Sequence, residues 1–227
     1  MTKRVLFLLA AALFLAACPV TAEDGGTSVE DILDGMKAAE QDIRDARFSF
    51  SQEIELKVVA EKHFVEGELV YKQPRSIYHR QIKPVEQISV INEKELIIYN
   101  PATNQVYVDT WKNWPGITYF VPGIFNRKGS IKDLEKYFEF RLFADEEEFY
   151  ILHVVPADKK KVKKYFKEQF DFYLWVDKKD MFPRRSKLIS EDVVCVTDIK
   201  DWEVNTDPDD EIFEFEIPEG AEVIKLK

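Results

Sequence analysis

The chain has 227 residues, a formal net charge of −10 and two cysteines. Such an acidic chain is a poor partner for nucleic acid, because phosphate groups require a basic surface. Only eight glycines and ten prolines accompany 17 Phe, nine Tyr and four Trp. This composition indicates a packed domain rather than a linker-rich or disordered chain.

The N-terminus has the three-part layout of a secretory signal peptide. Lys3 and Arg4 precede an unbroken apolar run at 5–17, and small residues lead to a cleavage position after Ala22. The run is too short to cross roughly 30 Å of hydrocarbon as a helix. We therefore expect a leader at 1–22 and one domain at 23–227. Loss of Lys3 and Arg4 with the leader changes the net charge from −10 to −12.

A second processing signal overlaps the first. The sequence Leu-Ala-Ala-Cys ending at Cys18 resembles a bacterial lipobox, in which Cys18 becomes the lipid-modified first residue of an anchored lipoprotein. Pro19 directly after the cysteine, and the small residues Val20 and Ala22, favour release by the ordinary signal peptidase. We expect a soluble protein, with anchoring at Cys18 as the open alternative. The released form keeps only one cysteine, Cys195, so it cannot form an internal disulfide. We expect Cys195 to be a buried strand residue.

The mature chain is predicted to begin with one helix and continue in strands. Ser28 and Asp31 form a capping-box pattern for a helix at 28–46, along which Ile32, Met36 and Ile43 share one face. From Phe48 the apolar residues alternate with polar ones, which predicts a long strand with one wet face. Further strands are predicted at 64–72, 76–82, 87–91, 96–99 and 105–110, and their short connections indicate an antiparallel meander.

The alternation stops at a mid-chain apolar segment, 111–128, which two Pro-Gly pairs interrupt. It is too apolar for a solvated loop and too broken for one helix, so we expect it to lie against an apolar surface. A short helix at 131–138 is predicted to follow. Strands are then predicted at 139–143, 149–155, 170–176, 184–189, 193–203 and 213–216. Many antiparallel strands with one helix and an apolar flap favour a curved sheet with helices over one face.

The sequence does not indicate catalytic chemistry. His63, His79 and His153 lie within strand patterns without metal-ligand spacing, and the chain has neither a G-x-S-x-G elbow nor a glycine-rich phosphate loop. We therefore predict no enzyme, no cofactor and no metal. The acidic run 145–148 is expected to be an exposed hairpin turn. The basic run 159–164 is either a solvated loop or a docking patch for an acidic partner or a membrane surface.

Several short segments resemble one known family. They are the Phe-Ser-Phe-Ser-Gln at 48–52, Gly-Glu-Leu-Val-Tyr-Lys-Gln-Pro at 67–74, Tyr-Asn-Pro at 99–101, Asp-Leu-Glu at 133–135, Leu-Trp-Val-Asp at 174–177 and Phe-Glu-Phe at 213–215. Their order and spacing, over nearly the whole mature chain, resemble the periplasmic outer-membrane lipoprotein carriers of the LolA type.

The resemblance implies a mainly β single domain: an incomplete antiparallel β-barrel, or curved sheet, with a helical lid at about 111–138 over a hydrophobic cavity. It implies a monomeric periplasmic carrier that takes lipoproteins from an inner-membrane releasing transporter to an outer-membrane acceptor. The implied acyl-chain site comprises Phe48, Phe50, Leu69, Tyr71, Val90, Ile98, Trp111, Trp114, Ile117, Phe120, Val121, Ile124 and Phe125.

One departure from the family pattern concerns the latch that holds the lid. The family often carries an arginine just before the proline that ends its second strand, whereas this chain has Gln73 there, with Arg75 two residues on. Either residue is a candidate latch. Two other roles stay open for the same fold: a lipid-anchored outer-membrane lipoprotein receptor, through Cys18, and a periplasmic lipid-sensing regulatory module.

Overall fold

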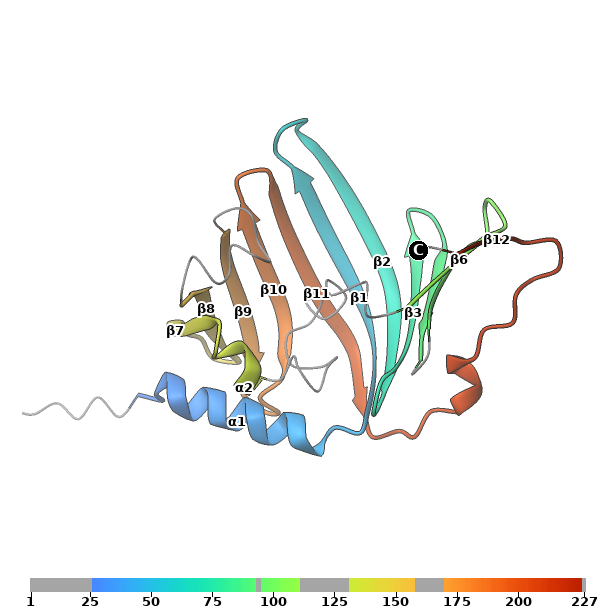
Figure 1. Ribbon diagram of the computed structural model, residues 1–227. Helices are drawn as coiled ribbons and strands as arrows, with labels where there is room; N and C mark the ends of the chain where they lie inside the picture. The colour runs from blue at the N-terminus through green and yellow to red at the C-terminus, as the bar shows by residue number, and fades with distance from the viewer. Residues whose placement is uncertain (1–25, 93–94, 111–130, 158–169, 226–227) are drawn as a thin grey trace, which may run out of the picture.

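The computed structural model describes residues 26–92, 95–110, 131–157 and 170–225. The strands of this part of the chain form one open, curved sheet in the order β12-β6-β5-β4-β3-β2-β1-β11-β10-β9-β8-β7 (Figure 1). All neighbours are antiparallel except β12 and β6, which are parallel. The strands are β1 Asp45–Leu56, β2 Glu61–Lys72, β3 Ser76–Lys83, β4 Gln87–Ile91, β5 Leu96–Asn100, β6 Gln105–Asp109, β7 Phe138–Asp145, β8 Phe149–Pro156, β9 Phe170–Asp177, β10 Pro183–Ser190, β11 Val193–Val204 and β12 Glu222–Lys225. The predicted mainly β, curved-sheet fold is confirmed, and the sheet is not closed into a barrel.

The helix α1, Val29–Asp42, begins with the predicted capping box. The Ser28 hydroxyl accepts a hydrogen bond from the backbone N–H of Asp31, and the Asp31 carboxylate accepts one from the N–H of Ser28. The helix ends earlier than the predicted Ala46, because β1 begins at Asp45 and pairs there with Lys72. Among the described residues, no helix is both long and apolar enough to cross a membrane.

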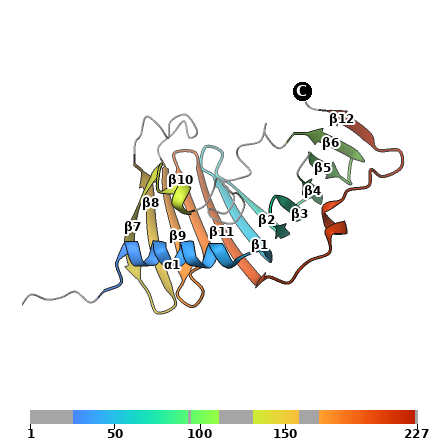
Figure 2. The same cartoon turned by 60° about the horizontal axis from the view of Figure 1, so that its bottom comes forward.

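The helix α1 covers one face of the sheet, and we call this face of the sheet the inner face. α1 lies across β7 to β11 near one end of their strands (Figures 1 and 2). Its buried residues Ile32 and Met36 pack with Leu152 of β8 and Leu174 of β9. Because side chains directly opposite each other on paired strands point to the same face, the register places the remaining inner-face residues. Leu174 pairs with Ser186, and the row continues through Thr197 and Gln52 to β2.

The C-terminal segment crosses the opposite, outer face. A short 3₁₀ helix, η3 (Asp210–Phe213), lies against β3, and the ring centroid of Phe215 is 5.5 Å from that of Tyr99 on β5. The predicted strand at 213–216 is therefore wrong. Its alternating Phe-Glu-Phe pattern arises because Phe213 is buried against the sheet rather than because the segment belongs to the sheet. The strand that does form, β12, was not predicted and pairs with β6.

The second helix, α2, spans only Ile131–Leu134, so the predicted helix at 131–138 is too long. The chain leaves the helical path because the Tyr137 carbonyl accepts a hydrogen bond from the N–H of Ala157, which joins this segment to the β7–β8 pair. The predicted turn at 145–148 is confirmed. Asp145 ends β7, and the N–H of Glu146 donates to the carbonyl of Phe149 at 2.9 Å.

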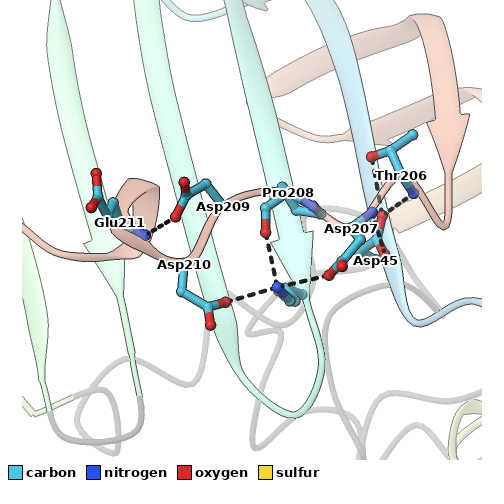
Figure 3. A network of polar contacts seen from close by, with 8 residues as sticks. Asp45, Thr206, Asp207, Pro208, Asp209, Asp210 and Glu211 are labelled. Carbon is cyan, nitrogen blue, oxygen red and sulfur yellow. Dashed lines mark hydrogen bonds and ion pairs between the residues drawn. The ribbon is translucent and has the colours of Figure 1, made fainter.

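A polar network at the corner between α1 and β1 holds the start of the C-terminal segment (Figure 3). The buried Asp45 carboxylate accepts hydrogen bonds from the backbone N–H groups of Thr206 and Asp207, at 2.7 and 3.2 Å. Nearby, the Lys72 ammonium pairs with Asp207 and Asp210, at 3.1 and 2.8 Å. These contacts direct the chain from the end of β11 onto the outer face.

Candidate functional site

The inner face carries two apolar clusters, one on each half of the sheet. The first includes Phe48 and Phe50 of β1 and Leu69 and Tyr71 of β2, all of them buried, and Ile98 of β5 packs against it. The second joins α1 and α2 to β7, β8 and β9. Burial of large apolar side chains stabilises both clusters by roughly 1.5–3 kcal/mol for each fully buried residue.

Two aromatic residues that the sequence analysis missed complete the first cluster. The ring centroids of Phe182 and Trp202 are 3.8 Å apart and the rings are stacked, and Trp202 is 5.6 Å from Phe48. Phe182 lies in the β9–β10 connection, and Trp202 is near the end of β11. The alternation at 193–203 could have assigned Trp202 to a face of its strand, but nothing local to Phe182 indicated that it belonged to this cluster.

Away from α1, the inner face stays apolar while its side chains become partly exposed. This region includes Ile54 and Leu56 of β1, Val65 of β2, Leu188 of β10 and Phe172 of β9, all half-buried. These residues continue, along their strands, the same face as the buried positions of the two clusters. The face therefore offers apolar surface that the described residues bury only in part.

The structure brings together five of the predicted acyl-chain residues: Phe48, Phe50, Leu69, Tyr71 and Ile98. Val90 is not among them. It pairs with Tyr78 and Ile97, whereas its neighbour Ser89 pairs with His79 and Ile98 on the inner face. Val90 therefore lies on the outer face, and its assignment to the site is wrong. The predicted Trp111, Trp114, Ile117, Phe120, Val121, Ile124 and Phe125 lie outside the described residues, as do Cys18 and the basic run 159–164.

Between the two clusters, polar side chains cross the middle of the inner face. We call Gln52, Thr197 and Ser186, together with Arg184 at the start of the same strand as Ser186, the polar strip. Thr197 pairs directly with Gln52 on one side and with Ser186 on the other, and the Gln52 amide donates to the Thr197 hydroxyl at 3.1 Å. Nearby on β11, burial raises the pKa of the half-buried Cys195 thiol.

The histidines have structural partners. His79 on the inner face stacks on Phe50 with centroids 5.4 Å apart, and burial lowers its pKa. His153 Nε2 is 2.9 Å from an Asp171 carboxylate oxygen, and its ring stacks on Tyr173 at 4.6 Å. Within the described part of the chain, no three His, Cys, Asp or Glu side chains are grouped to hold a metal ion.

The candidate latch residue Gln73 contacts the corner between α1 and β1. Its side-chain Nε2 donates to the carbonyl of Ile43 at 2.7 Å, and its backbone N–H donates to the carbonyl of Arg44 at 2.8 Å. The lid that Gln73 or Arg75 was expected to hold lies mostly outside the described residues. The latch therefore stays a prediction.

The described residues thus form an open curved sheet with a partly exposed apolar face that a helix closes at one end. The chain belongs to the outer membrane lipoprotein carrier protein LolA family, whose model matches residues 41–216. Members of this family are binding and carrier proteins. No curated protein matches this chain in sequence.

Solved structures share the fold at low sequence identity. An uncharacterized conserved protein from Thermus thermophilus has a TM-score of 0.55 at 14% identity, covering 87% of this chain and 98% of that one. A crystal structure of MucB has a TM-score of 0.51 at 16% identity, covering 82% of this chain and 62% of MucB. A LolA superfamily protein from Nitrosomonas europaea has a TM-score of 0.41 at 13% identity, covering 84% and 99%.

Proposed function

We propose that this protein carries the acyl chains of lipoproteins through the periplasm, from the inner membrane to the outer membrane. The observation that supports the proposal is the inner face. On the single strand β1, this face carries the buried Phe48 and Phe50 and, beyond Gln52, the half-buried Ile54 and Leu56. Family membership supports the same role.

Such a role needs binding and no chemistry. Removing an acyl chain from water is favourable by about 0.8 kcal/mol of free energy for each CH₂ group. Exposing a chain of roughly sixteen carbons to water therefore costs about 13 kcal/mol. A sheet that offers apolar surface on one face offsets this cost during transfer. In this proposal the apolar segment 111–125 is the lid, and the ligand lies between the lid and the inner face.

The partners follow from the proposed role. They are lipoproteins, an inner-membrane transporter that releases them and an outer-membrane acceptor. The chain without its leader, with a net charge of −12, would be repelled by anionic membrane surfaces, which suits a carrier that leaves the donor membrane. We expect it to act as a monomer.

An anchored receptor is the second candidate, because Cys18 supports it. The two roles share the inner face and differ at the N-terminus, so mass spectrometry of the mature protein separates them. A chain beginning at Glu23 supports the carrier, and a lipid-modified Cys18 supports the receptor. A regulatory module is the third candidate, because MucB shares the fold over 82% of this chain and 62% of MucB.

The test of the binding face uses two glutamates on one strand. Phe50→Glu places a charge in the inner face, whereas the matched Ser51→Glu changes the next residue, which points to the outer face. With both variants folded by circular dichroism, we expect Phe50→Glu to lose most of its bound triacylated lipoprotein and Ser51→Glu to keep it. Equal binding by the folded Phe50→Glu protein and the wild type would show that the inner face is not the site.

A further inference from the structure

We propose that the polar strip binds the ester or amide carbonyl by which an acyl chain is attached, so that the site prefers acylated molecules to free fatty acids or to alkyl chains without a carbonyl. This inference rests on the proposed function, because it concerns the same face. It assigns a hydrogen-bonding role to Arg184, Ser186 and Thr197, which neither the family resemblance nor the sequence patterns singled out, and to Gln52, which ends the segment at 48–52.

The position of the strip is the first argument. Gln52, Thr197 and Ser186 follow one another across β1, β11 and β10, and the next residue in the row is Leu174 of the second cluster. Polar side chains in the middle of an apolar face cost free energy unless they are hydrogen-bonded. A ligand lying across the inner face would have its hydrocarbon on the clusters and its polar linkage near this strip.

The second argument is an unused donor on Arg184. The residue follows Pro183 at the start of β10, at an irregularity in the pairing of β10 with β9, so its aromatic contacts and not the register place it at the inner face. Its guanidinium carbon lies 5.3 Å from the Trp202 ring centroid and 5.7 Å from that of Phe182, the aromatic pair that completes the first cluster. Within the described residues, Arg184 Nη1 is the one buried side-chain nitrogen or oxygen without a hydrogen-bond partner.

The other side of this guanidinium faces two carboxylates. Nη2 donates to the Asp180 carboxylate, and Nε is at an ion-pair distance of 3.8 Å from an oxygen of Asp177. The side chain is only 20% exposed. Two carboxylates and two aromatic rings therefore hold the guanidinium in one orientation and leave Nη1 as the donor for a ligand. Buried donors are almost always paired, so an unpaired one indicates a missing acceptor.

The local charge decides which acceptor suits this donor. Asp177 and Asp180 together carry one more negative charge than Arg184 neutralises. A free carboxylate or a phosphate would be repelled by this excess, because a like charge in a partly buried site is costly. An ester or amide carbonyl accepts a hydrogen bond and carries no charge. The donor set therefore fits a neutral carbonyl.

The experiment compares two neutral probes that differ only in the carbonyl. 1-Palmitoylglycerol contains an ester, and 1-O-hexadecylglycerol has an ether in its place. Their affinities are measured by displacement of the neutral dye N-phenyl-1-naphthylamine from the mature protein, with palmitate as the anionic probe. A charge-assisted hydrogen bond is expected to give the wild type about a tenfold preference for the ester over the ether. Palmitate should bind more weakly than the ester.

Two variants of Arg184 test the assignment, and the neighbouring arginine is the control. Arg184→Met removes the donor, and Arg184→Lys keeps the charge near Asp180 but lacks the second guanidinium nitrogen. Both should bind the ether like the wild type and lose the preference for the ester. Arg185→Met should keep the preference, because Arg185 pairs with Asp198 and lies over Trp175 on the outer face.

The outcomes separate this inference from the proposed function. Equal wild-type affinities for ester and ether, or an ester preference that survives in folded Arg184→Lys, would overturn the role of the strip while leaving the carrier proposal intact. Tighter binding of palmitate than of the ester would overturn the charge argument. If neither neutral probe displaces the dye from the wild type, the lipid-binding face itself is wrong and the strip has no role.

Discussion

The side-chain amide of Gln73 donates a hydrogen bond to the backbone carbonyl of Ile43 at 2.7 Å, joining the end of β2 to the residue that caps α1. The position at which the family resemblance implied a lid latch therefore holds the corner where the helix enters the sheet. A helix of 14 residues leaves its last carbonyls without partners inside the helix, so a side chain that donates to a carbonyl at this end stabilises it.

We expect Gln73→Ala to loosen α1. Loss of this hydrogen bond should lower the free energy of unfolding by about 0.5–1.5 kcal/mol, measured by urea denaturation, and should speed amide exchange in the last turn of α1. Gln81→Ala is the control, because the Gln81 amide bonds the carbonyl of Val85 in an exposed turn. Similar exchange in α1 for both variants would contradict the role of Gln73.

The latch prediction itself is tested by Gln73→Arg. If position 73 controls the lid, the arginine should favour the closed, empty form, lower lipoprotein retention and increase amide protection across 111–128, since a ligand opens a lid only through its differential affinity for the two forms. Equal protection in the variant and the wild type would shift the assignment to Arg75.

Asp45→Asn should release the start of the C-terminal segment. The Asp45 carboxylate is 4% exposed and accepts from two backbone N–H groups and the Thr206 hydroxyl. An amide nitrogen there would face donors, and the expected loss is about 1–3 kcal/mol of unfolding free energy. Asp42→Asn should be neutral or slightly stabilising, because Asp42 is an exposed negative charge at the C-terminus of α1. Thermal unfolding of both variants checks the difference.

Gly67→Ala should disturb the Phe50 side chain. A Cβ atom at Gly67 would lie 2.6 Å from Phe50 Cζ and 2.5 Å from the Arg80 carbonyl oxygen, and the latter belongs to the backbone and cannot rotate away. We expect a loss of about 1–3 kcal/mol from overpacking and weaker binding of an acyl probe. Gly26→Ala, which meets nothing within 4 Å, should behave like the wild type in both assays.

His79 should make stability depend on pH. Burial lowers its pKa below the ordinary 6.5, so the unfolded chain takes up a proton at His79 more readily than the folded one. The contribution of neutral His79 to the free energy of unfolding is complete above the pKa of this residue in the unfolded chain. It is lost as the pH falls through the lower pKa of the folded protein. His79→Gln should therefore reduce the difference in unfolding free energy between about pH 7.5 and about pH 5.5, the range in which histidine titrates. An unchanged difference in the folded His79→Gln variant would contradict the role of His79.

Local patterns in the sequence were enough to determine the start of α1, most of the strands and the curved-sheet class. The capping box at Ser28 and the two-residue alternation from Phe48 depend only on neighbours along the chain, so they could be recognised without a structure. The alternation at 213–216 led to the wrong prediction of a strand because it, too, is only a local pattern. A segment that lies flat on a sheet also buries every second residue.

Only the tertiary structure decided which strands share a face and what lies between them. Alternation assigns the residues of one strand to its two sides. The pairing with the neighbouring strand decides which residues of the two strands share a face, and a single bulge reverses that assignment. For this reason Val90, an apolar strand residue like Ile98, belongs to the other face. The polar strip likewise appears only when β1 is placed beside β11 and β10, because these strands come from opposite ends of the mature chain and no local pattern relates Gln52 to Thr197 and Ser186.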